Sequence, residues 1–123
     1  MIPSGPDSIA IDQLLEDYKD AAMAHRHASR EGDQERANPA YERLASVIRE
    51  LRNRTEKEQE AFLDLLDDPS IEVRGWAAAH ALEFVPDRAE PVLERIASGP
   101  ESLEEFSARM VLREWRGGRL RFP

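Results

Sequence analysis

The chain has 123 residues, of which 41 % are hydrophobic and 34 % charged, and its formal net charge is −8. This length suits one domain with a single modest core, and the acidic balance argues against general binding to nucleic acid or an anionic membrane. The chain has no cysteine, which excludes a disulfide framework, thiol catalysis and thiolate zinc sites. No apolar run approaches the roughly 18 residues of a membrane span, and no signal pattern opens the chain, so we expect a cytoplasmic protein.

The N-terminal region predicts an arm followed by a long helix. Two prolines and a glycine within residues 1–7 favour an extended, flexible segment. After a cap at Asp7 or Ser8, apolar residues recur every three or four positions as far as about Arg30, which indicates an amphipathic helix. Gly32 suits the left-handed position that ends such a helix.

The second predicted helix has two possible starts. Asp33 can cap it, in which case Pro39 lies inside the helix and is expected to kink it. Alternatively, Asn38 caps it and Pro39 takes the first helical position. Either start leads into one apolar stripe that ends at Leu51.

Proline and glycine breaks divide the remaining chain into four shorter helices and a tail. Every apolar pattern has a period near 3.6 residues and no alternating strand pattern occurs, so the predicted class is all-α. The expected helices cover residues 55–66, 70 to 84 or 85, 91–97 and 101–116. Residues 117–123 are expected to form a flexible tail, and residues 1–123 a single domain.

The last four predicted helices contain an internal repeat. A shift of 30 residues, which carries Phe62 onto Val92, superimposes two helices and the turn between them. Repeats of this period are typical of helical hairpins stacked side by side. The other coinciding positions are Leu63 with Leu93, Leu66 with Ile96, Val73 with Leu103, Ala77 with Ser107, Ala78 with Ala108, Ala81 with Val111 and Leu82 with Leu112.

Within this repeat, Asp68-Pro69 followed by Val73-Arg74, Ala77-Ala78 and Ala81-Leu82 resembles the second helix of a HEAT repeat. The longer pattern, from the N-terminal helix through Asn38 and Leu44 to Leu112–Trp115, is similar to a family of small bacterial all-helical proteins without an assigned function. The resemblance implies an all-α, HEAT-like superhelix of about six helices stacked as antiparallel hairpins. It brings no catalytic residues.

Arg74 falls in the middle of the apolar arc of its helix, at about 100° per residue. A guanidinium on a buried face must be paired and hydrogen-bonded. The available partners are Asp67 and Asp68, or Asp64, and the resemblance implies a tie to a turn aspartate. We therefore expect a structural pair, with a ligand-binding arginine as the alternative.

The opposite arc of the same helix supplies the predicted binding surface. Aromatic residues, methionine and arginine are enriched at interface centres. We expect a non-enzymatic module that binds a protein or peptide, or a second copy of the chain, without cofactor or metal. Its residues are Trp76, Ala79, His80 and Glu83, joined through the repeat by Phe106, Arg109, Met110 and Arg113. The alternative is that Trp76 and Phe106 pack between hairpins or under the long N-terminal helices.

Two other classes of function remain open. The first is a contact with nucleic acid or an acidic partner through an arginine-rich C-terminal stretch. This stretch contains Arg109, Arg113, Arg116, Arg119 and Arg121, and Glu114 is its only acidic residue. The same arginines also suit a helix C-terminus and a solvated tail. The second is a small-molecule enzyme or carrier that uses His80 in a pocket. Glu83 follows His80 at helical spacing, but no third metal ligand is evident.

Overall fold

The structure is a computed structural model that describes residues 9–123, so the predicted arm and its cap at Asp7 or Ser8 lie outside the described residues. Within residues 9–123 the chain forms six α-helices, one short 3₁₀ helix and no strand. The prediction of an all-α protein of about six helices is confirmed, while the HEAT-like superhelical arrangement stays a prediction. The chain divides into two compact units, Met1–Ala61 and Phe62–Pro123. Whether they form a single domain stays a prediction.

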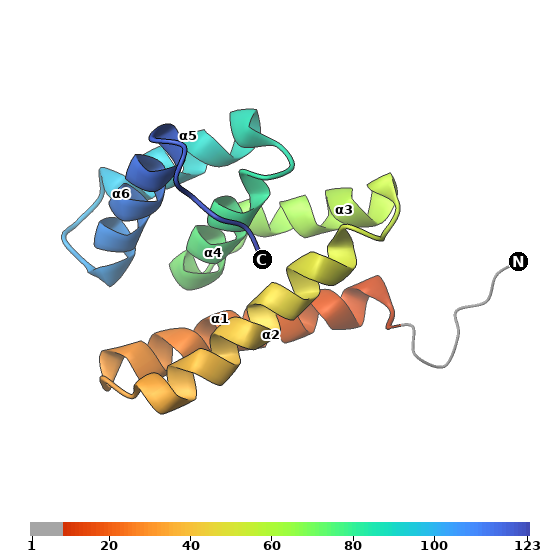
Figure 1. The fold of residues 1–123 in the computed structure, drawn as a ribbon, viewed down its shortest axis with the longest axis horizontal. Coiled ribbons are helices and arrows are strands. Elements are labelled where there is room, and N and C mark those ends of the chain that lie inside the picture. Colours follow the sequence, from red (N-terminus) through yellow and green to blue (C-terminus); the bar gives the residue numbers. More distant parts are fainter. Residues whose placement is uncertain (1–8) are drawn as a thin grey trace, which may run out of the picture. The chain divides into compact units, whose positions relative to one another are not determined.

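The first unit is built on an antiparallel hairpin of two long helices, α1 (Ile11–Arg30) and α2 (Gln34–Leu51), which lie side by side (Figure 1). Gly32 has a φ of 69°, the left-handed conformation expected at the turn. The buried faces of both helices carry apolar side chains at helical spacing. The largest of these are Tyr18, Leu44, Ile48 and Leu51.

The structure decides between the two possible starts of the second helix. The Asp33 carboxylate accepts a hydrogen bond of 3.2 Å from the backbone N–H of Arg36, so Asp33 is the cap of α2. Pro39 therefore lies inside the helix and is exposed.

Arg54 joins the end of α2 to the start of α3 (Glu56–Leu63). Its Nε donates to Glu50 at 2.8 Å, its Nη1 to Glu58 at 3.1 Å and its Nη2 to the carbonyl oxygen of Ile9 at 2.6 Å. The side chain is 13 % exposed. Thr55 and Glu58 also cap each other, because the Glu58 N–H donates to Thr55 Oγ1 and the Thr55 N–H donates to Glu58 Oε1. The predicted helix start at Thr55 is thus confirmed.

We expect Glu58→Gln to make the free energy of unfolding depend less steeply on pH at acidic pH. The backbone N–H of Thr55 and the Arg54 guanidinium hold the pKa of Glu58 below its ordinary value of 4.5. Because the folded-state pKa is depressed, ionised Glu58 stabilises the fold above pH 4.5, and this contribution is lost as the pH falls through the lowered value. Urea unfolding across that window measures the effect.

The matched control for this prediction is Glu56→Gln, which changes an exposed glutamate in the first turn of the same helix. If the Glu58→Gln and wild-type curves keep a constant separation at every pH, the depressed pKa is not linked to folding.

The second unit packs three helices and a 3₁₀ helix together: η1 (Asp64–Asp67), α4 (Ile71–Ala81), α5 (Pro86–Ala97) and α6 (Leu103–Arg116). α4 contacts η1, α5 and α6, and α5 also contacts α6 (Figure 1). Serine side chains cap two of these helices. Ser70 accepts from the Val73 N–H at the start of α4, and Ser102 accepts from the Glu105 N–H at the start of α6.

Three helix boundaries in this region differ from the predictions. The helix expected at residues 55–66 changes to 3₁₀ geometry at Asp64. α4 ends at Ala81 rather than at residue 84 or 85, because the chain tightens there: the N–H groups of Glu83 and Phe84 donate to the carbonyl oxygens three residues earlier, those of His80 and Ala81. Val85, the residue before Pro86, has φ −142° and ψ 70° and is not helical. Pro86 then occupies the first position of α5, where its missing N–H costs nothing, so Pro91 lies inside that helix instead of starting it.

The internal repeat predicts burial well in some positions and fails in others. Leu63 and Leu93 are both buried, as are the pairs Ala78 with Ala108 and Leu82 with Leu112. By contrast, three α6 positions are exposed or half-buried where their α4 counterparts are buried, namely Leu103, Ser107 and Val111. The repeat therefore breaks on one face of α6.

The C-terminal segment folds back on the end of α6. Gly118 has a φ of 73°, and the N–H groups of Arg119 and Leu120 donate to the carbonyl oxygen of Glu114 at 2.8 and 3.1 Å. The tail predicted to be flexible is thus hydrogen-bonded to α6 as far as Leu120. Of the helices that the structure describes, none is long and apolar enough to cross a membrane.

Candidate functional site

The α4 half of the predicted binding surface is largely covered. His80 is 5 % exposed, so its placement on an open surface was wrong. It follows Val73 by seven residues, two helical turns, and therefore shares that residue's buried face. The His80 ring stacks on Trp76 with 5.6 Å between ring centroids and 27° between planes. Trp76, Ala79 and Glu83 are half-buried.

The α6 half of the predicted surface is open. Phe106 is 55 % and Met110 37 % exposed, and Leu103, at the same helical face, is 48 % exposed. Arg109 and Arg113 are exposed beside them. Sequence reasoning missed Leu103 because its repeat counterpart, Val73, is a core residue.

Acidic side chains of the chain itself pair with most of the C-terminal arginines. Arg109 forms an ion pair with Glu105, and Arg119 pairs with Glu114 at 3.1 Å. Arg116 donates to Glu90 at 2.9 Å and to Glu94 at 2.7 Å, and these bonds raise its pKa. Within residues 9–123, Arg113 and Arg121 are the members of the predicted basic stretch without an ion pair.

Arg74 bonds the turn before its helix, but through different acceptors from those predicted. Its Nη1 donates to the carbonyl oxygens of Asp68 and Pro69 at 2.7 and 3.0 Å. The expected pairing with the Asp67 or Asp68 carboxylate is therefore corrected. The Asp68 carboxylate instead accepts a hydrogen bond from the Ser70 N–H at 3.0 Å. Arg74 donates to two main-chain carbonyl oxygens of the turn, which would lack the donor that a regular helix provides.

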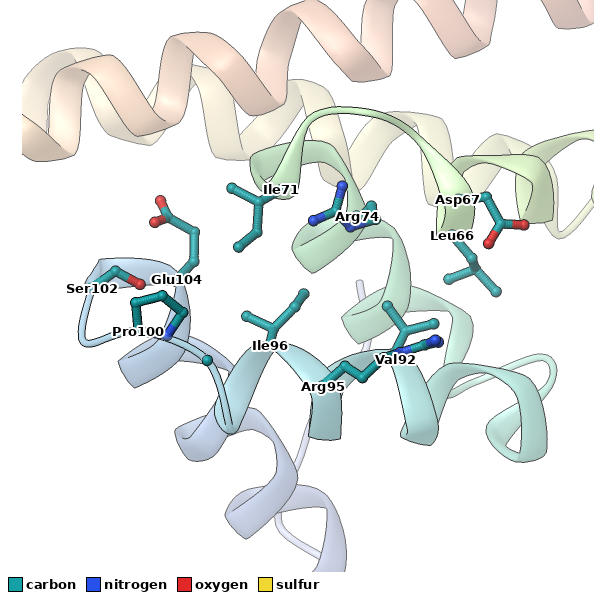
Figure 2. A pocket seen from close by; sticks show the side chains of 11 residues that line it. Leu66, Asp67, Ile71, Arg74, Val92, Arg95, Ile96, Pro100, Ser102 and Glu104 are labelled. Carbon is teal, nitrogen blue, oxygen red and sulfur yellow. The ribbon is translucent and has the colours of Figure 1, made fainter.

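A pocket of about 590 Å³ lies within the second unit, and sequence reasoning did not find it. Figure 2 shows its wall residues coming from η1, α4, α5 and the beginning of α6. Apolar side chains line much of it, and two guanidinium groups reach it, those of Arg74 and Arg95. The volume lies in the range of about 300–1,000 Å³ that is usual for ligand sites. The only sequence signal was an arginine on an apolar helix face.

Residues 9–123 contain no group of three or more His, Asp or Glu side chains placed to hold a metal ion. His80 does not line the 590 Å³ pocket. It also does not line a second pocket, which lies between α1 and α2.

Comparison with known proteins gives a family and a fold. A family described as "Domain of unknown function (DUF2019)" matches residues 12–115. The crystal structure of the protein RPA1889 from Rhodopseudomonas palustris CGA009 is similar, with a TM-score of 0.82 and 23 % identity over 94 % of this chain and 95 % of that chain. At this identity the likeness shows the fold alone. A search of curated proteins finds no match.

Proposed function

Since the chain belongs to the DUF2019 family, a domain of unknown function, we propose from its own surface that it is a non-enzymatic module that binds a protein or peptide partner. The proposed contact is the α6 face, defined here as Leu103, Phe106 and Met110. The observation that carries the proposal is the exposure of these three large apolar side chains along one side of one helix. Such a strip marks an interaction surface more often than scattered single residues do.

The α6 face is held in place by the other side of the same helix. Ala108 and Leu112 are buried, and Arg116 ties the end of α6 to two glutamates of α5. A partner therefore meets a surface that is already ordered, which lowers the entropy lost on binding. Phenylalanine and methionine are both enriched at the centres of protein interfaces.

The charged border of the α6 face indicates what a partner should carry. Arg113 lies one turn beyond Met110, is exposed, and has no ion pair among residues 9–123. We expect a partner that inserts an apolar group against Phe106 and places a carboxylate near Arg113. A second copy of the acidic chain is one such partner.

The test begins with a photo-crosslinking residue at Ser107, an exposed position between Leu103 and Met110. The crosslinked partner is identified, purified and titrated against the wild-type chain. Because truncating a hot-spot residue of an interface costs at least about 2 kcal/mol, we expect Phe106→Asp and Met110→Asp each to weaken binding by about 30-fold or more. Met23→Asp is the matched control, since Met23 is an exposed methionine of α1.

Sedimentation of the chain alone decides whether the partner is a second copy. Trp76 is a poorer position for the test because it stacks on buried His80, so its replacement also disturbs packing. The proposal is refuted if the chain is monomeric and Phe106→Asp binds the crosslinked partner as tightly as the wild-type chain does.

A further inference from the structure

We propose that the 590 Å³ pocket of the second unit is a binding site for a carboxylate attached to a short apolar group. A free apolar carboxylic acid and the C-terminal residue of a peptide both present this chemistry. The site is separate from the α6 face, because Leu103, Phe106 and Met110 do not line it. Its ligand class follows from the orientation of Arg74, the position of Arg95, the flanking acids and the apolar lining.

Arg74 is oriented before any ligand arrives. Its Nη1 is held by the carbonyl oxygens of Asp68 and Pro69 at 2.7 and 3.0 Å, which fixes the plane of the guanidinium. Within residues 9–123, its Nε and Nη2 have no hydrogen-bond partner. These two nitrogens form an edge with parallel N–H groups, the geometry that binds both oxygens of a carboxylate.

Arg95 supplies a second positive charge from the opposite wall. Figure 2 shows Arg74 on the α4 side of the pocket and Arg95 on the α5 side. Arg95 is exposed and forms no ion pair with any described residue. An anion held by Arg74 is therefore also attracted by the Arg95 guanidinium, which forms no ion pair with a side chain of residues 9–123.

The acids at the pocket favour a single negative charge over two. Asp67 and Glu104 line the pocket on opposite sides of Arg74 (Figure 2). A phosphate dianion would meet two carboxylates as well as two guanidiniums, whereas a carboxylate carries one charge and matches the planar edge of Arg74. The flanking acids thus select the smaller anion.

The rest of the lining fits an apolar body. Leu66, Ile71, Val92 and Ile96 line the pocket around Arg74. A hydrocarbon group of a few carbons that leaves water against these side chains gains about 0.8 kcal/mol per buried CH₂. The carboxylate fixes the orientation of the ligand, and the hydrocarbon supplies much of the affinity.

The test is an amide-resonance titration of the full chain with four probes: hexanoate, hexanamide, acetyl-Ala-Ala-Leu with a free carboxylate, and the same peptide as its C-terminal amide. We expect at least one acid to shift the amides of Ile71, Gly99 and Ser102, and its amide counterpart to leave them in place. Binding of hexanoate alone identifies a small-molecule acid as the source, and binding of the peptide acid alone identifies a peptide terminus.

Two arginine variants make the test specific. Arg95→Gln is expected to weaken binding of the acid about tenfold, because it removes one charge-assisted contact from an exposed position that the fold does not need. Arg113→Gln, an exposed arginine of α6 outside the pocket, should bind as the wild-type chain does. The proposal is overturned if acids and amides shift the same resonances equally, if neither acid binds, or if Arg95→Gln retains full affinity.

Discussion

Replacing Phe62 by alanine is expected to lower the free energy of unfolding by about 3–5 kcal/mol. Phe62 is 1 % exposed, so the truncation removes a ring from a packed environment and leaves a cavity that the surroundings fill only in part. The same substitution at exposed Phe106 should change the free energy by less than about 0.5 kcal/mol. Urea denaturation of the three proteins measures both effects.

This pair of variants also tests the premise of the proposed function. The α6 face is available to a partner only if Phe106 contributes little to the fold. A loss of stability in Phe106→Ala as large as that in Phe62→Ala would mean that the ring is packed in solution, and the binding proposal would lose its basis.

Replacing Arg74 by methionine is expected to cost about 1–3 kcal/mol. Methionine keeps much of the apolar stem but removes the donor that satisfies the carbonyl oxygens of Asp68 and Pro69. The turn between η1 and α4 then carries two acceptors that must find water or remain unpaired. Thermal and urea unfolding provide the measurement.

Arg95→Met is the matched control, because Arg95 lines the same pocket but bonds no described residue. Its free energy of unfolding should stay within about 0.5 kcal/mol of the wild-type value. Equal stability of the Arg74→Met and Arg95→Met variants would show that the bonds from Arg74 to the turn contribute nothing to the fold.

Much of the fold could be predicted because its signals are local. The 3.6-residue period of apolar side chains marks the helices, and hydroxyl caps such as Thr55 and Ser70 mark where two of them begin. The start of α2 was left open because Asp33 and Asn38 both have the chemistry of a cap. Only the observed bond from the Arg36 N–H to Asp33 decides between them.

The candidate sites were predicted less well because they depend on which helices become neighbours. Phe106 and Met110 are exposed, as a binding surface requires, whereas His80, predicted for the same surface, has the spacing from Val73 that matches the buried face. The sequence predicted that Arg74 would bond the turn, but it could not distinguish a carboxylate from a main-chain carbonyl as acceptor. The pocket combines short contributions from four elements, and no local pattern marks such a combination.

The prolines inside two helices have a consequence for backbone dynamics. Pro39 is the sixth residue of α2 counted from Gln34, and Pro91 is the sixth of α5 counted from Pro86. Neither has an N–H to donate to the carbonyl group four residues earlier, so the hydrogen-bonded ladder is interrupted at the same depth in both helices. The first turn of α2 is held by the Asp33 cap, and that of α5 by the fixed φ of Pro86. Because the interrupted ladder couples these turns only weakly to the rest of each helix, we expect them to open at a lower free energy than the residues that follow.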